Sequence, residues 1–267
     1  MAKESPRRPK ILVFDIETAP ITAYTWGLFD ERIGLNQIKE DWHLLAWAAK
    51  WYGDPASKVM YMDNRHAKKI SDDKKLVKKL SDLLNQADGV ITQNGKSFDV
   101  KKVNARAVIN GLPPIKPPVN HTDILREGRK VFSFTSHRLE YISNTINKKY
   151  KKLLHKEYPG FELWKAVLTG NKHAWDVMKK YAIHDVLATE EAVEKIRGWI
   201  KTQRLSTYTS NDTMHCKCGS TDLEKRGYAH TDYGKYQIYK CKACGKWPRG
   251  SVNLLSTEKK KNILRDK

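Results

Sequence analysis

Long apolar runs are scarce in this sequence of 267 residues, and their scarcity excludes several classes of protein. No stretch of about 18 apolar residues is present, so the sequence predicts no membrane-spanning helix. The opening residues lack the apolar core of a secretory signal peptide, and we therefore expect a cytoplasmic protein in a reducing compartment. Cysteine is limited to four residues in the last quarter of the chain, which in that compartment favours metal binding over disulfide bonds.

Acidic residues are few relative to basic ones. Lys and Arg number 50 against 30 Asp and Glu, and the formal net charge is +20. The excess is present in residues 1–200 and is proportionally larger in residues 201–267. This sign of charge favours polyanionic partners such as nucleic acids, with binding that weakens as salt rises. Charge alone is equally compatible with simple solubility.

The apolar pattern alternates between short strands and amphipathic helices. Residues 11–14 form an unbroken apolar run, typical of a strand buried on both faces in the middle of a sheet. Further strands are expected at 44–52, 58–62 and 89–93, and helices at 72–86, 98–110, 138–147, 173–180 and 181–200. This succession predicts an α/β layered domain.

Composition divides the chain into two domains and a tail. The α/β domain is expected at residues 8–204. A polar stretch rich in Ser, Thr and Asn at 202–213 is expected to be the linker. A small second unit follows at 214–250, and residues 251–267 form a basic tail.

Four acidic residues and one tyrosine follow apolar elements at three places in the α/β domain. Asp15 and Glu17 are two apart after the first strand, so their side chains project from the same face. Asp99 lies in the first turn of its expected helix, and Tyr181 and Asp185 are four apart on another, sharing one face. Carboxylates held close together repel each other unless a cation offsets their charge, and Mg²⁺ or Mn²⁺ favours such oxygen ligands.

The ordered set resembles the three exonuclease motifs of the DEDD superfamily. The motifs are Asp-x-Glu after an apolar strand, Asn-x₃-Phe-Asp opening a helix and Tyr-x₃-Asp in a late helix. Tyr181 before the last aspartate, with Lys180 where the histidine subgroup would place His, resembles the DEDDy branch. The resemblance is nearest to the proofreading exonuclease domains of family B polymerases and to stand-alone relatives common in bacteriophages, and it covers roughly residues 8–200. It implies a ribonuclease-H-like fold, a mixed sheet flanked by helices.

The resemblance also implies roles for the motif residues. Asp15 would bridge two Mg²⁺ or Mn²⁺ ions, Glu17 and Asp185 would complete the first site, and Asp99 would serve the second, directly or through water. Tyr181 would orient the attacking water.

The same resemblance implies the reaction. It is metal-dependent 3′–5′ exonuclease hydrolysis that releases nucleoside monophosphates from single-stranded DNA, with Asn94 and Phe98 lining the groove for the terminal nucleotide. Replication or repair proteins are candidate partners, and the location would be the host cytoplasm if a phage encodes the protein. Two alternatives stay open: a 3′–5′ exoribonuclease, and a nucleic-acid-binding accessory protein that acts mainly through its second unit.

The second unit is similar to a zinc ribbon. Its cysteines form two close pairs, Cys216 with Cys218 and Cys241 with Cys244, and four thiolates suit a structural Zn²⁺ site. The first pair is separated by one residue instead of the usual two. The ligands are therefore either the four cysteines or a set in which His215 replaces Cys216.

Aromatic and cationic residues are interleaved between and after the cysteine pairs. The rings are Tyr228, Tyr233, Tyr236, Tyr239 and Trp247, and the cations are Arg226, Lys235, Lys240, Lys242 and Arg249. This composition suits the bases and phosphates of a single strand. Docking of a protein is the alternative.

Overall fold

The computed structural model describes residues 9–29, 32–117, 120–153, 157–202, 204–208 and 213–264. The chain divides into two compact units, one at Lys10–Lys195 and one that contains the chain from Ile196 onward. Each unit has a sheet of its own. Of the expected linker, residues 203 and 209–212 lie outside the described residues, as do residue 8 of the expected α/β domain and residues 265–267 of the expected tail. Within the described ranges, no helix is both long enough and apolar enough to cross a membrane.

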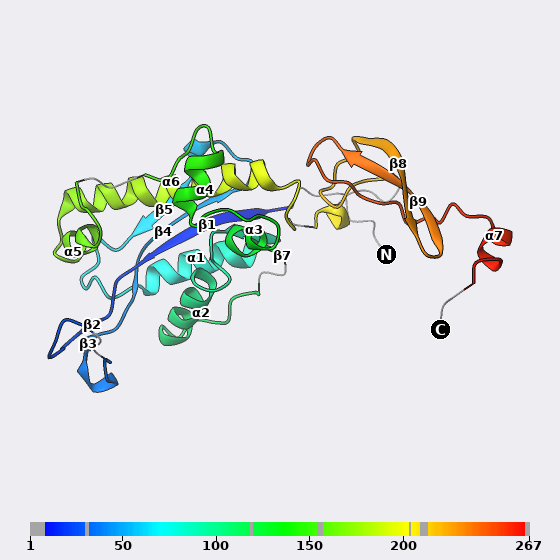
Figure 1. Ribbon diagram of the computed structural model, residues 1–267. Helices are drawn as coiled ribbons and strands as arrows, with labels where there is room; N and C mark the ends of the chain where they lie inside the picture. Colours follow the sequence, from blue (N-terminus) through cyan, green and yellow to red (C-terminus); the bar gives the residue numbers. More distant parts are fainter. Residues whose placement is uncertain are drawn as a thin grey trace, which may run out of the picture. The chain divides into compact units, whose positions relative to one another are not determined.

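A mixed five-stranded sheet forms the centre of the first unit (Figure 1). Its order is β5 (Met60–Asp63), β4 (Leu44–Trp51), β1 (Ile11–Thr18), β6 (Gly89–Thr92) and β7 (Asn120–Asp123). Strand β1 pairs antiparallel with β4 and parallel with β6; β4 and β5 are antiparallel, and β6 and β7 are parallel. The mixed sheet expected from the sequence is thus confirmed, with the apolar strand at its centre. The strand β7 was not expected.

Helices cover both faces of this sheet. In Figure 1, α1 (Lys74–Gln86) and α2 (Asp99–Ile109) lie on one side, and α4 (Leu139–Ile146) and α6 (Lys172–Ile196) lie on the other. Leu12, Phe14 and Ile16 of β1 belong to a buried apolar cluster that includes residues of α1 and α2. Since side chains alternate along a strand, the odd-numbered residues of β1 face α4 and α6.

Helix α6 corrects one detail of the sequence interpretation. The pattern predicted two helices, at 173–180 and 181–200, whereas one continuous helix of 25 residues runs from Lys172 to Ile196. No Gly or Pro interrupts this stretch, so nothing in the backbone requires a break. The other α-helices described in this unit are α3 (Ile124–Arg129) and α5 (Glu162–Leu168). Two short 3-10 helices, at Leu35–Gln37 and Ala56–Lys58, are also described, and a two-stranded ribbon joins β2 (Thr22–Ala23) to β3 (Ile38–Glu40).

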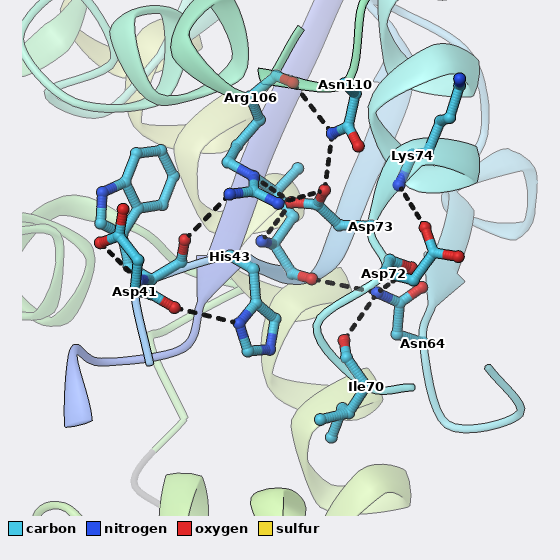
Figure 2. Close-up of polar contacts among 11 residues, drawn as sticks. Asp41, His43, Asn64, Ile70, Asp72, Asp73, Lys74, Arg106 and Asn110 are labelled. Carbon is cyan, nitrogen blue, oxygen red and sulfur yellow. Dashed lines mark hydrogen bonds and ion pairs between the residues drawn. The ribbon is translucent and has the colours of Figure 1, made fainter. Parts of the chain in front are cut away.

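A buried ionic network ties α1, α2 and the start of β4 together (Figure 2). Asp73, which precedes α1, has no solvent exposure. Its carboxylate accepts hydrogen bonds from Nε and Nη2 of Arg106 at 2.7 and 2.8 Å and from Nδ2 of Asn110 at 2.8 Å. It also accepts one from the backbone N–H of Leu44 at 2.8 Å. One side chain therefore joins three elements of the unit.

The substitution Asp73→Asn is expected to destabilise the first unit by about 3–5 kcal/mol, because it leaves the buried guanidinium of Arg106 without its counter-charge. Urea unfolding followed by far-UV circular dichroism measures the loss. The matched control is Asp82→Asn, which breaks an exposed ion pair with Lys78 and should cost less than about 0.5 kcal/mol. Equal losses in the two variants would contradict the prediction.

The second unit is built on an antiparallel hairpin of β8 (Leu223–Thr231) and β9 (Gly234–Cys241). A third segment, residues 246–250, runs along the other edge of β9. The backbone N–H of Tyr239 donates to Pro248 at 2.9 Å, and Ile238 pairs with Arg249. A short helix, α7 (Thr257–Lys261), follows.

Candidate active site

Strand β1 carries Asp15 and Glu17 on the face of the sheet that α4 and α6 cover. Two backbone pairings fix the register there, Asp15 opposite Ala48 and Glu17 opposite Ala46 of β4. Glu17 is buried, and Asp15 is partly exposed. The predicted projection of both carboxylates from one face therefore matches the geometry of the strand.

Helix α6 brings Tyr181 and Asp185 to the same place, one turn apart on one face. Together with β1, these residues line a hollow of about 360 Å³. The lining consists of Asp15, Glu17, Gln93, Asn94, Leu125, Arg138, Leu139, Glu140, Lys152, Tyr181 and Asp185, which we call the acidic hollow. Five of the seven residues expected at the catalytic and nucleotide-binding site thus meet in one cavity.

The other two expected residues, Asp99 and Phe98, are not part of this lining. Asp99 is buried behind it, and its Oδ1 accepts a hydrogen bond from the backbone N–H of Ile16 at 3.1 Å. Since Ile16 lies between the two β1 carboxylates, Asp99 is adjacent to them. Phe98 is 38% exposed, and Nζ of Lys102 lies 5.5 Å from its ring centroid.

Burial and mutual repulsion raise the pKa values of these carboxyl groups. Burial is the largest cause for Asp15, whose pKa is well above its usual range, and the charges of Asp99, Glu17 and Asp185 add to it. Burial, followed by the charge of Asp185, raises the pKa of Glu17 to about 8. Burial raises the pKa of Asp185 as well, although Lys152 opposes the shift. The hollow therefore binds protons or cations more readily than isolated carboxylates do.

Lys152 is the main residue of the hollow that sequence reasoning missed. Its Nζ lies 2.7 Å from Oδ2 of Asp185 and 4.6 Å from the ring centroid of Tyr181. Burial by itself lowers the pKa of Lys152, but Asp185 and Tyr181 outweigh this effect and raise that pKa. The ammonium group is thus a fixed positive charge among four acids.

Helix α6 itself holds the segment that carries Lys152. The carboxylate of Glu191 accepts hydrogen bonds from the backbone N–H groups of Lys148, Lys149 and Tyr150, the shortest at 2.7 Å. Nδ2 of Asn147 donates to the carbonyl of Ala188 at 2.9 Å. The basic stretch at 147–156 was the only sequence signal for this residue; its last part, 154–156, lies outside the described residues.

Asn94 is held in the hollow by a tight turn after β6. It has a positive φ of 67°, and its backbone N–H donates to Oδ1 of Asp123 at 3.0 Å. Oδ2 of Asp123 accepts from the N–H of Lys96 at 3.0 Å. A Cβ atom on Gly95 would lie 2.4 Å from Oγ1 of Thr92, so only glycine fits there. Asp123, which the sequence did not single out, thereby fixes one wall of the site.

The donor chemistry of the hollow fits a hard divalent cation. Asp15, Glu17 and Asp185 offer carboxylate oxygens, with Asp99 behind them, and Oδ1 of Asp185 is buried without a hydrogen-bond partner among the described residues. Among the described residues, the oxygens of these carboxylates do not form a group that lies within 4.8 Å of one another, and Oδ2 of Asp185 pairs with Lys152 instead. In the described part of the chain, the ligand atoms of four cysteines do converge. They form a group in which all the atoms lie within 4.8 Å of one another.

That set consists of all four cysteines of the second unit. Sγ of Cys216 lies 3.7 Å from Sγ of Cys244, and the same distance separates Cys218 from Cys241. His215 is not a member of the group, and its Nδ1 lies 2.8 Å from the carbonyl of Thr213. The arrangement therefore corresponds to the four-cysteine alternative.

The turns behind the cysteines use glycine in the left-handed region. Gly219 and Gly245 have φ values of 88° and 76°. The N–H of Gly219 donates to the carbonyl of Cys216, and that of Gly245 donates to Cys241. The hydrogen bond of the first turn joins residues three apart, and that of the second turn joins residues four apart. This difference accommodates the shorter spacing of the first cysteine pair.

A family model described as the RNase_H superfamily matches residues 31–197. The match includes Asp99, Tyr181 and Asp185 but begins after Asp15 and Glu17. Among solved structures, the family B DNA polymerase from the hyperthermophilic archaeon Pyrobaculum calidifontis is similar, with 14% identity, a TM-score of 0.48 and 72% of this chain covered. The chain spans 25% of the length of that polymerase. No curated protein matches this sequence.

Proposed function

Because this chain belongs to the RNase_H superfamily, we propose that it is a metal-dependent 3′–5′ exonuclease of the DEDDy type that releases nucleoside monophosphates from single-stranded DNA. One observation carries the proposal: β1 and α6 place Asp15, Glu17, Tyr181 and Asp185 in one hollow of a strongly basic chain. Hydrolysis of a phosphodiester in such a site needs a positioned water, neutralised phosphate charge and a stabilised leaving oxygen.

Asp15, Glu17 and Asp185 would hold Mg²⁺ or Mn²⁺, with Asp99 contributing from behind directly or through water. Bound cations of this kind supply a nucleophilic water at neutral pH and neutralise charge on the leaving 3′ oxygen. Asp99 also holds the backbone of Ile16, so it keeps the two β1 carboxylates in place.

The remaining residues of the hollow would position water and substrate. Burial raises the pKa of Tyr181, so its hydroxyl stays protonated and donates a hydrogen bond. It is therefore suited to orient the attacking water but not to accept a proton from it. Lys152 and the exposed Arg138 provide cations for the phosphate. Asn94 lines the wall where the terminal nucleotide would lie.

Cation binding to the hollow is expected to strengthen as pH rises. The pKa of Glu17 is about 8 in the folded chain against 4.5 for the free side chain. The folded state therefore retains a proton that the unfolded state releases, and the metal-free protein loses stability as pH rises between these values. A bound cation must displace this proton. The rise in Tm on adding Mg²⁺ should be larger at pH 8 than at pH 6, and Glu17→Gln should reduce the difference. Equal rises at both pH values in the parent would contradict the prediction.

Digestion of 5′-labelled oligonucleotides tests the proposed function. Single-stranded DNA, duplex DNA and RNA are incubated side by side with Mg²⁺, with Mn²⁺ and with chelator. A ladder that shortens one nucleotide at a time from the 3′ end of single-stranded DNA, and that chelator abolishes, supports the proposal. Internal cleavage, shortening from the 5′ end or digestion in chelator would refute it, and a stronger ladder on RNA would replace the substrate with RNA.

We further propose that Cys216, Cys218, Cys241 and Cys244 hold a structural Zn²⁺ ion. The mutual approach of their four sulfur atoms within 4.8 Å supports this site. Thiolate ligands select Zn²⁺ over the hard cations suited to the acidic hollow.

A further inference from the structure

One face of the sheet in the second unit gathers rings and cations from two segments. Ile238 of β9 pairs with Arg249, so their side chains share a face. Side chains two apart on a strand share a face too, which adds Tyr236, Lys240 and Trp247. We call these five residues the ribbon face. They come from β9 and from the segment at 246–250.

The ring contacts agree with this assignment. Cζ of Arg249 lies 4.1 Å from the ring centroid of Tyr236, and Nζ of Lys240 lies 5.6 Å from that of Trp247. Each pair joins the two segments across the face. A Cβ atom on Gly234 would lie 2.5 Å from the ring of Tyr236, so this ring lies against the backbone at the start of β9. The result is two cation–aromatic pairs side by side on a sheet.

These rings are not required as the core of the unit. Its buried cluster consists of Cys216, Cys241 and Cys244, with Cys218 and Leu223 packed against it. Cys241 follows Lys240 directly and so points to the opposite face. Trp247 is 59% exposed, and Arg249 is exposed as well. Tyr236 and Lys240 are half-buried, so the ribbon face presents chiefly the ring of Trp247 and the guanidinium of Arg249 to solvent.

Positive charge dominates around the ribbon face. Glu224 lies opposite Lys240 in the hairpin, and Oε1 of Glu224 pairs with Nη2 of Arg226 at 2.8 Å. This acid is thus compensated locally, while Arg249 and Lys240 keep their charge for a partner. Cations stacked on rings also disfavour an apolar protein surface, which would have to desolvate them. Charge complementarity therefore points to a polyanion with flat apolar groups.

We propose that the ribbon face is a binding site for single-stranded nucleic acid, made by the second unit alone. Bases stack on Trp247 and on the guanidinium plane and ring of the Arg249–Tyr236 pair, and phosphates pair with Lys240 and Arg249. Stacking of this kind tolerates any base, because every base has a π face. This site adds a binding function to the proposed hydrolysis, because it holds a strand whether or not the 3′ end of that strand is being cleaved.

The test measures binding of a labelled single-stranded DNA oligonucleotide by fluorescence anisotropy, without added divalent cation or chelator, in the Asp15→Asn background so that the probe stays intact. Trp247→Ala is expected to weaken binding about tenfold or more, the effect of one lost stacking partner. The double variant Lys240→Ala/Arg249→Ala should lower the slope of log Kd against log salt by about 1.4, since each single-strand phosphate contact contributes about 0.7.

Tyr228→Ala is the matched control. Tyr228 is 49% exposed and has its own cation, Lys235, 4.0 Å from the ring centroid, but it pairs with Gln237 and so lies on the opposite face. The affinity of Tyr228→Ala for the oligonucleotide should stay within about twofold of that of the parent, a change well below the effect of one lost stacking partner. Unchanged binding in Trp247→Ala and in the double variant would overturn the proposal, as would an equal loss in Tyr228→Ala. Zinc content and circular dichroism identify any variant that has lost its fold. If Trp247→Ala does not fold, Trp247→Phe replaces it in the test, and because this variant keeps a ring it should retain binding.

Discussion

Asp15→Asn is expected to slow the release of 3′-terminal nucleotides at least about 10³-fold. A cation that activates water and neutralises phosphate charge supplies several kcal/mol of barrier reduction, and each 1.36 kcal/mol is about tenfold in rate. Asp15 lines the hollow together with Glu17 and Asp185, and its carboxyl group interacts electrostatically with all three other acids. An amide in its place keeps the volume but removes its negative charge. Single-turnover digestion of 5′-labelled single-stranded DNA measures the rate.

Binding of the same oligonucleotide separates catalysis from general damage. The affinity of Asp15→Asn should remain within about twofold of the parent, because removing one acid from a basic chain does not weaken attraction to phosphates. Asp82→Asn, on the exposed side of α1, is the control and should keep the parent's rate. Digestion that persists in Asp15→Asn would refute the assigned site, whereas a parent protein that binds the oligonucleotide without digesting it would favour a protein that only binds nucleic acid.

Local geometry explains why much of the site could be predicted from the sequence. Asp15 and Glu17 need only the period of a strand, and Tyr181 and Asp185 need only the period of a helix. The unbroken apolar run at 11–14 indicated a central strand, and β1 does lie between β4 and β6. The part of the site that could be predicted is therefore the part that depends on residues close together in the chain.

The missed parts depend on contacts between distant segments. Lys152 reaches Asp185 across 33 residues, and Asp123 reaches Asn94 across 29, so no local period reveals either contact. Strand β7 has the sequence Asn-His-Thr-Asp, which carries no apolar alternation. Its pairing with β6 comes from the tertiary structure and overrides its weak strand propensity. The polar end of this strand is also what holds the Asn94 turn.

Removal of zinc from the second unit is expected to unfold its hairpin while the first unit stays folded. The buried cluster of this unit contains little besides cysteine and Leu223, and a unit so small depends on its metal for stability. Structural Zn²⁺ supplies an apparent free energy of about 10–16 kcal/mol in zinc-finger peptides. We expect one zinc per chain by mass spectrometry, and rapid proteolysis of residues beyond 213 after Cys241→Ser or after chelation. Fragments from Lys10–Lys195 should remain protected.

The two ligand sets give opposite outcomes in a pair of single variants. If the four cysteines bind the metal, Cys216→Ser loses zinc and His215→Ala keeps it, because the ring of His215 lies against the carbonyl of Thr213 and outside the sulfur cluster. If His215 is the ligand, the pattern reverses. Zinc retained by both variants, or a hairpin that resists protease without metal, would show that the cysteines do not hold the fold together. Because the ribbon face is built on the same hairpin, loss of zinc should also abolish the part of DNA binding that depends on Trp247.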